Sequence, residues 1–108
     1  MKIYIAGPYT QGDVAQNVFN AIKVADVLVA MGHTPYIPHL THFWHLVSPK
    51  EWSFWIKYDS QFLPLCDCLF RLEGASKGAD SEVHQATVLG LPVYYSLEEL
   101  KDDSMVLS

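Results

Sequence analysis

Two carboxylates stand at positions where their chemistry would matter more than their charge. Asp59 lies on the apolar stripe of a predicted helix, three and four residues after Ile56 and Trp55. A carboxylate there costs several kcal/mol unless it is paired or serves a site. Glu82 lies in the first turns of another predicted helix, whose N-terminus favours the ionised form. A burial-raised pKa suits Asp59 to donate a proton, and an ionised Glu82 would be a nucleophile. Asp59 could instead lie at a solvated margin of the apolar stripe or cap a neighbouring element, and Glu82 could be a surface residue that interacts with the helix dipole.

Two glycine-bounded loops could hold an anion or a sugar hydroxyl on free backbone N–H groups. One covers residues 7–13 and opens a helix at Asp13, and the other contains Ser76, Lys77 and Gly78 before the helix of Glu82. Backbone donors at a helix N-terminus bind phosphate. The first loop matches neither the Walker phosphate-binding loop nor the GxGxxG motif of dinucleotide-binding folds. An ordinary turn is the alternative for the second.

Three histidines, His39, His42 and His45, recur at steps of three residues. Such steps do not bring all three rings to one helical face, and no carboxylate or thiol lies within the segment. We therefore predict no metal site. With Phe43 and Trp44 between them, the rings would form a flat, amphipathic wall suited to stacking on a nucleobase. Core packing of Phe43 and Trp44 is the rival interpretation.

The elements that must position these residues alternate between strand and helix. Short apolar and β-branched runs predict strands at residues 2–6, 34–37, 67–72 and 92–95. Apolar spacings of three and four, with caps and glycine stops, predict helices between them. These helices run from Asp13 to Gly32, from a Ser48–Glu51 capping box to about Leu63, and from the 74–79 loop to Gly90, with a short final helix capped at Ser96.

This alternation predicts an α/β fold with a single, small, doubly wound parallel sheet of about four strands. The economical strand order is 2-1-3-4, in a flavodoxin-like three-layer sandwich. Ligands of such sheets bind beyond the carboxyl ends of the strands, where the strand order reverses. We therefore expect residues 7–13, the stretch after Ile37 and residues 74–79 to meet at one site.

Composition limits the function further. The 108 residues include 12 acidic and 7 basic side chains, for a formal net charge of −5, and 50% are hydrophobic and 13% aromatic. We expect one domain over residues 1–108, neither disordered nor suited to binding a nucleic acid polymer. No apolar run reaches about 18 residues, so no membrane span is predicted. Cys66 and Cys68 are too close for a structural bridge, which favours reduced thiols in a cytoplasmic protein. The many aromatics and low charge predict a homodimer or higher homo-oligomer.

Three sequence strings together resemble the nucleoside 2-deoxyribosyltransferase superfamily, which includes the 2′-deoxynucleoside 5′-monophosphate N-glycosidases. They are IYIAGPYT at residues 3–10, GASKGADSEVHQA at 74–86 and GLPVYY at 90–95, with Asp59 in the helix before the third strand. The similarity runs from Lys2 to about Leu100. Its most specific part combines YxxGP on the first strand with GxDxE before an LGxPV strand.

The resemblance implies an enzyme that cleaves the N-glycosidic bond of a (2′-deoxy)nucleoside or its 5′-monophosphate and needs no cofactor or metal. Glu82 matches the nucleophile that carries a covalent glycosyl intermediate. The sugar is then transferred from Glu82 to water or to another nucleobase. Asp59 matches the carboxylate that assists proton transfer to the leaving base, and Tyr4 matches a tyrosine beside the nucleophile. Ser76 matches the position that faces the 5′ substituent. The substrate contacts expected from the loops, the aromatic wall and the resemblance together are Gly7, Pro8, Tyr9, Ser76, Gly78, His42 and Trp44.

Two other functions stay open at this point. A non-catalytic nucleotide-binding or signalling module could use the same fold and would bind a ligand without turnover. A metal-dependent hydrolase could be built on His39, His42 and His45, although their spacing disfavours it. In each case the expected partner is a small molecule.

Overall fold

The computed structural model describes residues 1–107 and shows a parallel four-stranded sheet. Its strands are β1 (Lys2–Ala6), β2 (Thr34–Tyr36), β3 (Cys68–Arg71) and β4 (Val93–Tyr94), in the order β2-β1-β3-β4. The pairs β1–β2, β1–β3 and β3–β4 are all parallel. This is the flavodoxin-like α/β arrangement that the sequence predicted, and the strand order is confirmed.

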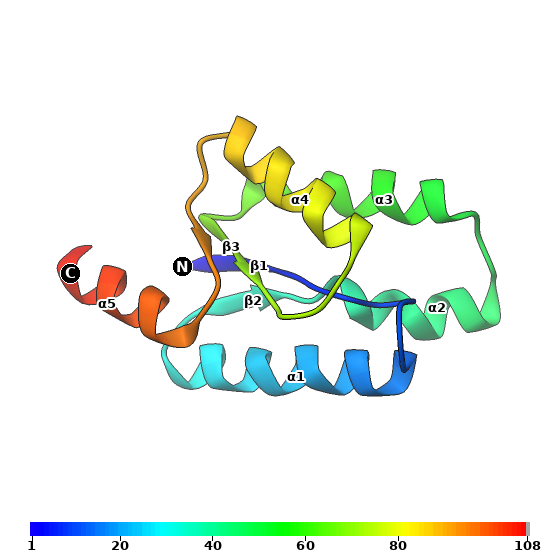
Figure 1. Ribbon diagram of the computed structural model, residues 1–108, viewed down its shortest axis with the longest axis horizontal. Helices are drawn as coiled ribbons and strands as arrows, with labels where there is room; N and C mark the ends of the chain where they lie inside the picture. The colour runs from blue at the N-terminus through cyan, green and yellow to red at the C-terminus, as the bar shows by residue number, and fades with distance from the viewer. Residues whose placement is uncertain (108) are drawn as a thin grey trace.

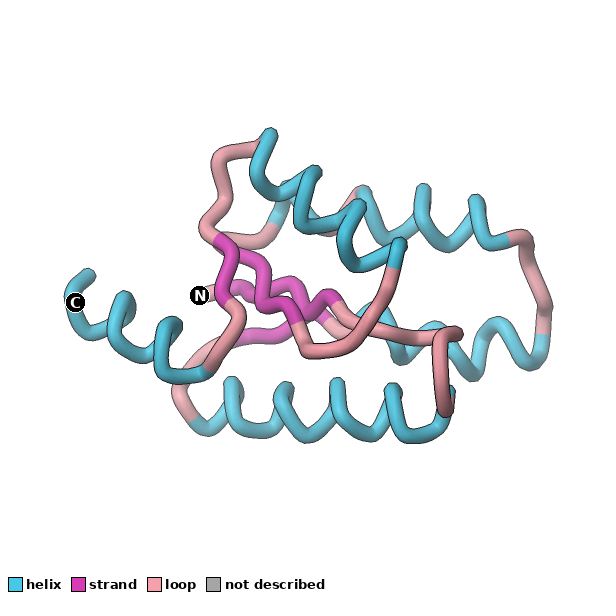
Figure 2. Tube along the Cα trace, viewed as in Figure 1, coloured by secondary structure: helices cyan, strands magenta, loops and turns pink. Residues whose placement is uncertain are grey.

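Helices cover both faces of the sheet (Figures 1 and 2). Helices α1 (Val14–Ala30) and α5 (Leu97–Leu107) lie on one side, and α3 (Trp52–Ser60) and α4 (Lys77–Val88) lie on the other. A 3₁₀ helix η1 (Pro38–Thr41) and the short α2 (His42–Val47) follow β2, and α2 projects past the carboxyl ends of the strands. A second 3₁₀ helix, η2 (Leu63–Leu65), joins α3 to β3.

Alternation along β1 divides the core into two layers, because successive side chains of a strand point to opposite faces. Ile3 and Ile5 belong to the layer under α1 and α5, together with Leu28 and Leu100. Tyr4 and Ala6 belong to the other layer, with residues of α4 and η2. Tyr4 is therefore a fully buried tyrosine directed toward the α3 and α4 side of the sheet.

Polar caps begin three of the helices. The Asp13 side chain accepts a hydrogen bond of 3.1 Å from the Gln16 N–H at the start of α1, as predicted. Ser96 accepts from the Glu99 N–H at 3.1 Å before α5, which confirms the predicted cap there. Ser76 caps α4, so Lys77 and Gly78 belong to the helix.

The predicted capping box at Ser48 is wrong. Helix α3 begins at Trp52, its N-cap Glu51 makes no side-chain cap bond, and the helix ends at Ser60. Ser48 ends the preceding helix instead, because its N–H donates to the Trp44 carbonyl at 2.8 Å. Helix α2 has no clear signal in the sequence, because its six residues are too few for an apolar period to show. Among the described residues, no helix is long and apolar enough to cross a membrane.

Candidate active site

A cavity of about 500 Å³ opens beyond the carboxyl ends of the strands. Gly7 and Tyr9 line it from the loop after β1, and Pro38 and His39 line it from η1 after β2. Ser76 and the start of α4 form a third part of the wall. The three segments expected to meet at one site therefore do meet, because parallel strands deliver their following loops to the same edge. Helix α3 contributes a fourth part of the wall, which includes Trp55 and Asp59.

Glu82 lines this cavity from the second turn of α4. Its Oε2 accepts a hydrogen bond from the hydroxyl of Tyr4, which reaches it from the centre of β1. The two residues are 78 positions apart in the chain and meet because α4 packs on the face of the sheet to which Tyr4 points. The tyrosine expected beside the nucleophile candidate is thus in direct contact with it.

Asp59 lines the same cavity from the end of α3 and is only 9% exposed. Its Oδ1 accepts a hydrogen bond of 3.2 Å from the hydroxyl of Tyr36. Tyr36 is the register partner of Tyr4 on the neighbouring strand, with ring centroids 5.4 Å apart. Two adjacent tyrosines of the sheet therefore each donate to one carboxylate of the cavity.

Burial is the main influence on the protonation of these two carboxylates and two tyrosines. It raises the pKa of Asp59 to about 6 against the opposing hydrogen bond from Tyr36, in the direction that the sequence predicted. It also raises the pKa of Glu82 to about 7, and the hydrogen bond from Tyr4 opposes the shift. The pKa values of Tyr4 and Tyr36 are raised as well, first by burial and then by the nearby carboxylates, so both hydroxyls keep their protons.

Burial therefore shifts the pKa of Glu82 in the direction opposite to the one expected from the helix N-terminus. Glu82 lies six residues beyond the cap Ser76, and the helix dipole acts mainly within the first turn. Loss of hydration on burial consequently outweighs the dipole.

The loop after β1 is shaped by close packing. A Cβ atom added to Gly7 would lie 2.8 Å from side-chain atoms of Leu72, so glycine is required there for contact with the β3 end. His39 Nε2 donates to the Pro8 carbonyl at 3.0 Å and anchors the loop. His39 is 4% exposed, and within the described residues its buried Nδ1 has no hydrogen-bond partner.

The start of α4 presents backbone and side-chain donors to the cavity. Ser76, Lys77, Gly78 and Ala79 all line it, and Ser76 Oγ accepts from the Ala79 N–H at 3.1 Å. The buried Arg71 holds the preceding loop in place. Its guanidinium donates to the carbonyls of Leu72 and Gly74 and to Asp80 Oδ1.

The three histidines each have a different partner. His39 bonds to the Pro8 carbonyl, His42 Nδ1 lies 2.5 Å from the Tyr9 hydroxyl, and His45 Nδ1 accepts from Trp55 Nε1–H at 2.9 Å. Over residues 1–107, no group of three or more His, Cys, Asp or Glu side chains is arranged to hold a metal ion.

Pro8, His42 and Trp44, which were expected to contact the ligand, are not among the residues that line the cavity. Pro8 and His42 stand behind the wall, where they contact His39 and Tyr9. Trp44 packs edge-on against Trp55 and Tyr58. For His42 and Trp44 the difference follows from α2, because a helical turn places neighbouring residues on different faces, whereas the flat wall assumed one common face.

Lys50 and Trp52 line the cavity although the sequence did not assign them to the site, and His45 was expected only as part of the histidine segment, not as a ligand contact. Trp52 and Trp55 are three residues apart on the stripe that also carries Asp59, so the stripe could have indicated them. Nothing in the local pattern distinguishes His45 from the other two histidines. Its place on the wall depends on how α2 packs beside α3.

Comparison with known proteins supports the fold and the family. A solved structure of a 2-deoxyribosyltransferase from the psychrotolerant bacterium Bacillus psychrosaccharolyticus superposes with a TM-score of 0.65 at 24% identity. The alignment covers 86% of this chain and 69% of that one, and at this identity it shows a shared fold. No curated protein sequence matches the chain. Residues 1–96 match a family model described as a domain of unknown function (DUF7768), and the chain therefore belongs to that family.

Proposed function

We propose that this protein cleaves the N-glycosidic bond of a (2′-deoxy)nucleoside or its 5′-monophosphate through a covalent glycosyl intermediate on Glu82. The observation that carries the proposal is the presence of Asp59 and Glu82 on the wall of one cavity, each hydrogen bonded to a tyrosine. A volume of about 500 Å³ is typical of small-molecule sites. The fold shared with a 2-deoxyribosyltransferase is consistent with this chemistry.

The proposed reaction has two steps. A carboxylate oxygen of Glu82 attacks C1′ of the sugar, the C1′–N bond breaks, and the bonding electron pair leaves with the base. Asp59 donates its proton to the departing base. Water or another nucleobase then attacks C1′ and gives up a proton to the Asp59 carboxylate, the ester bond to Glu82 breaks, and both carboxyl groups return to their starting states.

The two carboxyl groups are poised to exchange a proton near neutral pH. With pKa values of about 6 for Asp59 and about 7 for Glu82, the pair carries one proton in the interval between them, and the higher pKa of Glu82 places it mainly on Glu82. The proposed reaction needs the other arrangement, with the proton on Asp59 and Glu82 ionised. The hydrogen bond from Tyr4 stabilises the charged form of Glu82 in that arrangement.

The start of α4 supports a polar 5′ substituent at this end of the cavity. Ser76 and Gly78 lie at a helix N-terminus that faces the cavity, and the Lys77 ammonium adds positive charge. Gly7 and Tyr9 would contact the sugar. His42 would position Tyr9 from behind the wall, and the bond between His39 and the Pro8 carbonyl would hold the loop that carries it. Trp44 would support Trp55.

The test is incubation with deoxynucleosides, ribonucleosides and their 5′-monophosphates, with and without an acceptor base, followed by chromatography. Free base without acceptor indicates a hydrolase, and a new nucleoside with acceptor indicates a transferase. Glu82→Gln is expected to abolish base release while circular dichroism shows an intact fold. Glu98→Gln, a matched change of an exposed residue on α5, should keep full activity.

Two results would overturn the proposal. One is full activity of Glu82→Gln, which would exclude Glu82 as nucleophile. The other is the absence of base release from every substrate. Thermal stabilisation by nucleotides without any turnover would instead support a non-catalytic binding module.

A further inference from the structure

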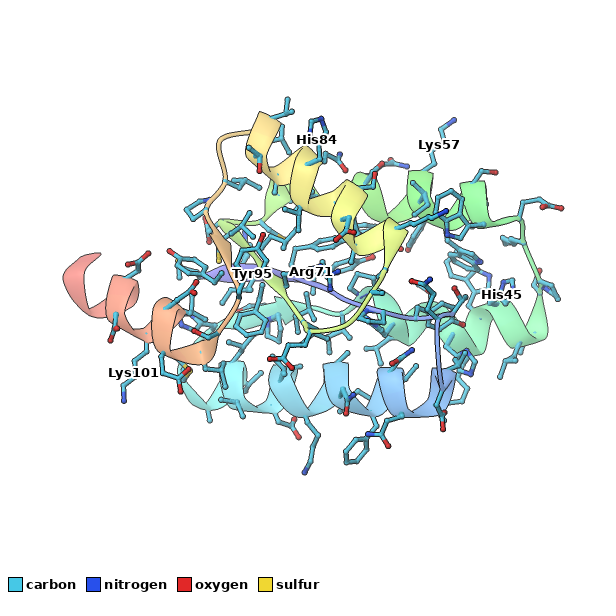
Figure 3. All side chains as sticks on the ribbon, in the orientation of Figure 1. His45, Lys57, Arg71, His84, Tyr95 and Lys101 are labelled. Carbon is cyan, nitrogen blue, oxygen red and sulfur yellow. The ribbon has the colours of Figure 1, made fainter. Side chains whose placement is uncertain are left out.

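A histidine on the cavity wall has no part in the proposed bond cleavage. His45 is half-buried in α2 and lines the cavity together with Trp52 and Trp55 of α3. It is labelled near the connection between α2 and α3 in Figure 3. The carboxylate pair is held by Tyr4 and Tyr36 and does not include it.

Two donors determine the tautomer of His45. Trp55 Nε1–H donates to His45 Nδ1 at 2.9 Å, and the backbone N–H of Lys50 donates to the same atom at 3.3 Å. Neither donor can accept a hydrogen bond, so Nδ1 must carry the lone pair. The neutral ring therefore has its proton on Nε2. No group among the described residues accepts a hydrogen bond from Nε2, which leaves this N–H as the polar group that His45 offers to a ligand.

A donor in a cavity with aromatic walls selects for an acceptor on a planar ring. Trp52 and Trp55 supply aromatic surface suited to a nucleobase. A base with an exocyclic oxygen presents an acceptor, whereas an amino group at the same position presents donors. An N–H facing an amino group leaves polar groups unpaired, and such mismatches discriminate strongly.

We propose that His45, held by Trp55 and the Lys50 backbone, donates its Nε2–H to the exocyclic oxygen of the base and makes the enzyme prefer oxo-bases to amino-bases. This inference rests on the proposed function and adds the class of base. The same hydrogen bond assists cleavage, because negative charge develops on the base as the C1′–N electron pair departs and spreads to its exocyclic oxygen.

The test uses substrates that differ in one group. Deoxyinosine and deoxyadenosine, with their 5′-monophosphates, carry a 6-oxo or a 6-amino group on the same ring system. The wild type is expected to favour the oxo substrate in kcat/KM. His45→Phe keeps a flat ring without the donor, and it should lower kcat/KM for the oxo substrate by about tenfold to a hundredfold. For the amino substrate, kcat/KM should stay within about threefold.

Two further variants separate recognition from mere packing. His45→Gln can place an amide N–H near the position of Nε2, and it should restore part of the preference. Trp55→Phe keeps an aromatic ring but removes the indole N–H that selects the tautomer, so the preference should weaken. A purely structural role would lower kcat/KM for both substrates alike in every variant.

Binding measurements keep this inference separate from the proposed function. Calorimetric titration with hypoxanthine and adenine compares the two base classes without turnover. Tighter binding of hypoxanthine that is lost in His45→Phe supports the inference even in a protein that releases no base. Equal efficiencies or affinities for the two classes in the wild type, or a preference that survives His45→Phe, would overturn it and leave the proposed function standing.

Discussion

At the scale of single residues, the central feature is a pair of carboxylates whose burial is only partly offset by hydrogen bonds. Tyr4 and Tyr36 each donate to one of them, yet the pKa values of Glu82 and Asp59 are both raised. A raised carboxyl pKa means that the folded state binds a proton more tightly than the unfolded state. Such a group lowers stability at neutral pH, which is typical of residues kept for chemistry rather than for folding.

This imbalance leads to a prediction about Glu82→Gln. Below about pH 4 Glu82 is protonated in both states and contributes nothing. As pH rises to about 7, the unfolded state loses its proton first, so the wild type loses stability and the variant does not. We expect Glu82→Gln to raise the free energy of unfolding at pH 8 by on the order of 2 kcal/mol, and by much less at pH 4.5.

Urea denaturation at the two pH values measures this difference. Glu98→Gln, which alters an exposed carboxylate, should change the free energy of unfolding by less than about 0.5 kcal/mol at either pH. A Glu82→Gln variant that is less stable than the wild type at pH 8 would contradict the prediction.

At the scale of elements, the loop between β3 and α4 determines where the cavity wall lies. Arg71 ends β3 and is labelled near the centre of the molecule in Figure 3. Its guanidinium bonds to the Leu72 and Gly74 carbonyls and to Asp80. The side chain of Arg71 is 9% exposed and that of Asp80 is 73% exposed, so the carbonyl contacts matter more than the ion pair.

We therefore predict unequal effects for the two partners of this ion pair. Arg71→Met should lower the free energy of unfolding by about 2 kcal/mol, because it removes charged donors from two loop carbonyls. Asp80→Asn should lower it by less than about 0.5 kcal/mol, since a solvated ion pair contributes little. Urea denaturation of both variants measures the difference, and equal losses would show that the ion pair itself holds the loop.

At the scale of the whole molecule, apolar side chains are exposed along α2 and the start of α3. Phe43, Leu46, Val47 and Trp52 have exposed fractions between 61% and 87%. The segment that carries them projects past the sheet (Figure 1). Contiguous exposed apolar surface commonly marks an association site. The homo-oligomer expected from the composition stays a prediction, and this surface is where we expect a second copy to pack.

Sedimentation equilibrium tests that prediction. The wild type should be dimeric or larger at micromolar concentration, and a Phe43→Ser/Val47→Asp double variant should shift it to monomer. Val88→Asp serves as a control, because Val88 is 72% exposed at the end of α4. A monomeric wild type, or equal dissociation by the control, would exclude an interface at this surface.

Much of the architecture could be predicted because its signals are local. The four strands and their order follow from the alternation of strand-like and helix-like hydrophobic patterns and from the short crossovers between them. The caps at Asp13 and Ser96 follow from the type of a single side chain. The Ser48 box was misassigned because the same side-chain types occur at the end of one helix as at the start of the next. The local pattern does not distinguish a residue that ends one helix from a residue that begins the next.

The sequence alone determined which carboxylates were candidates and which strand ends would surround them. Both depend on residue type and on spacing along the chain. Only the tertiary structure decided the pairing of Tyr4 with Glu82, of Tyr36 with Asp59 and of Trp55 with His45, across separations of 78, 23 and 10 residues. It also decided the protonation of Glu82, because desolvation depends on what packs around a side chain and the helix position alone predicted the opposite shift.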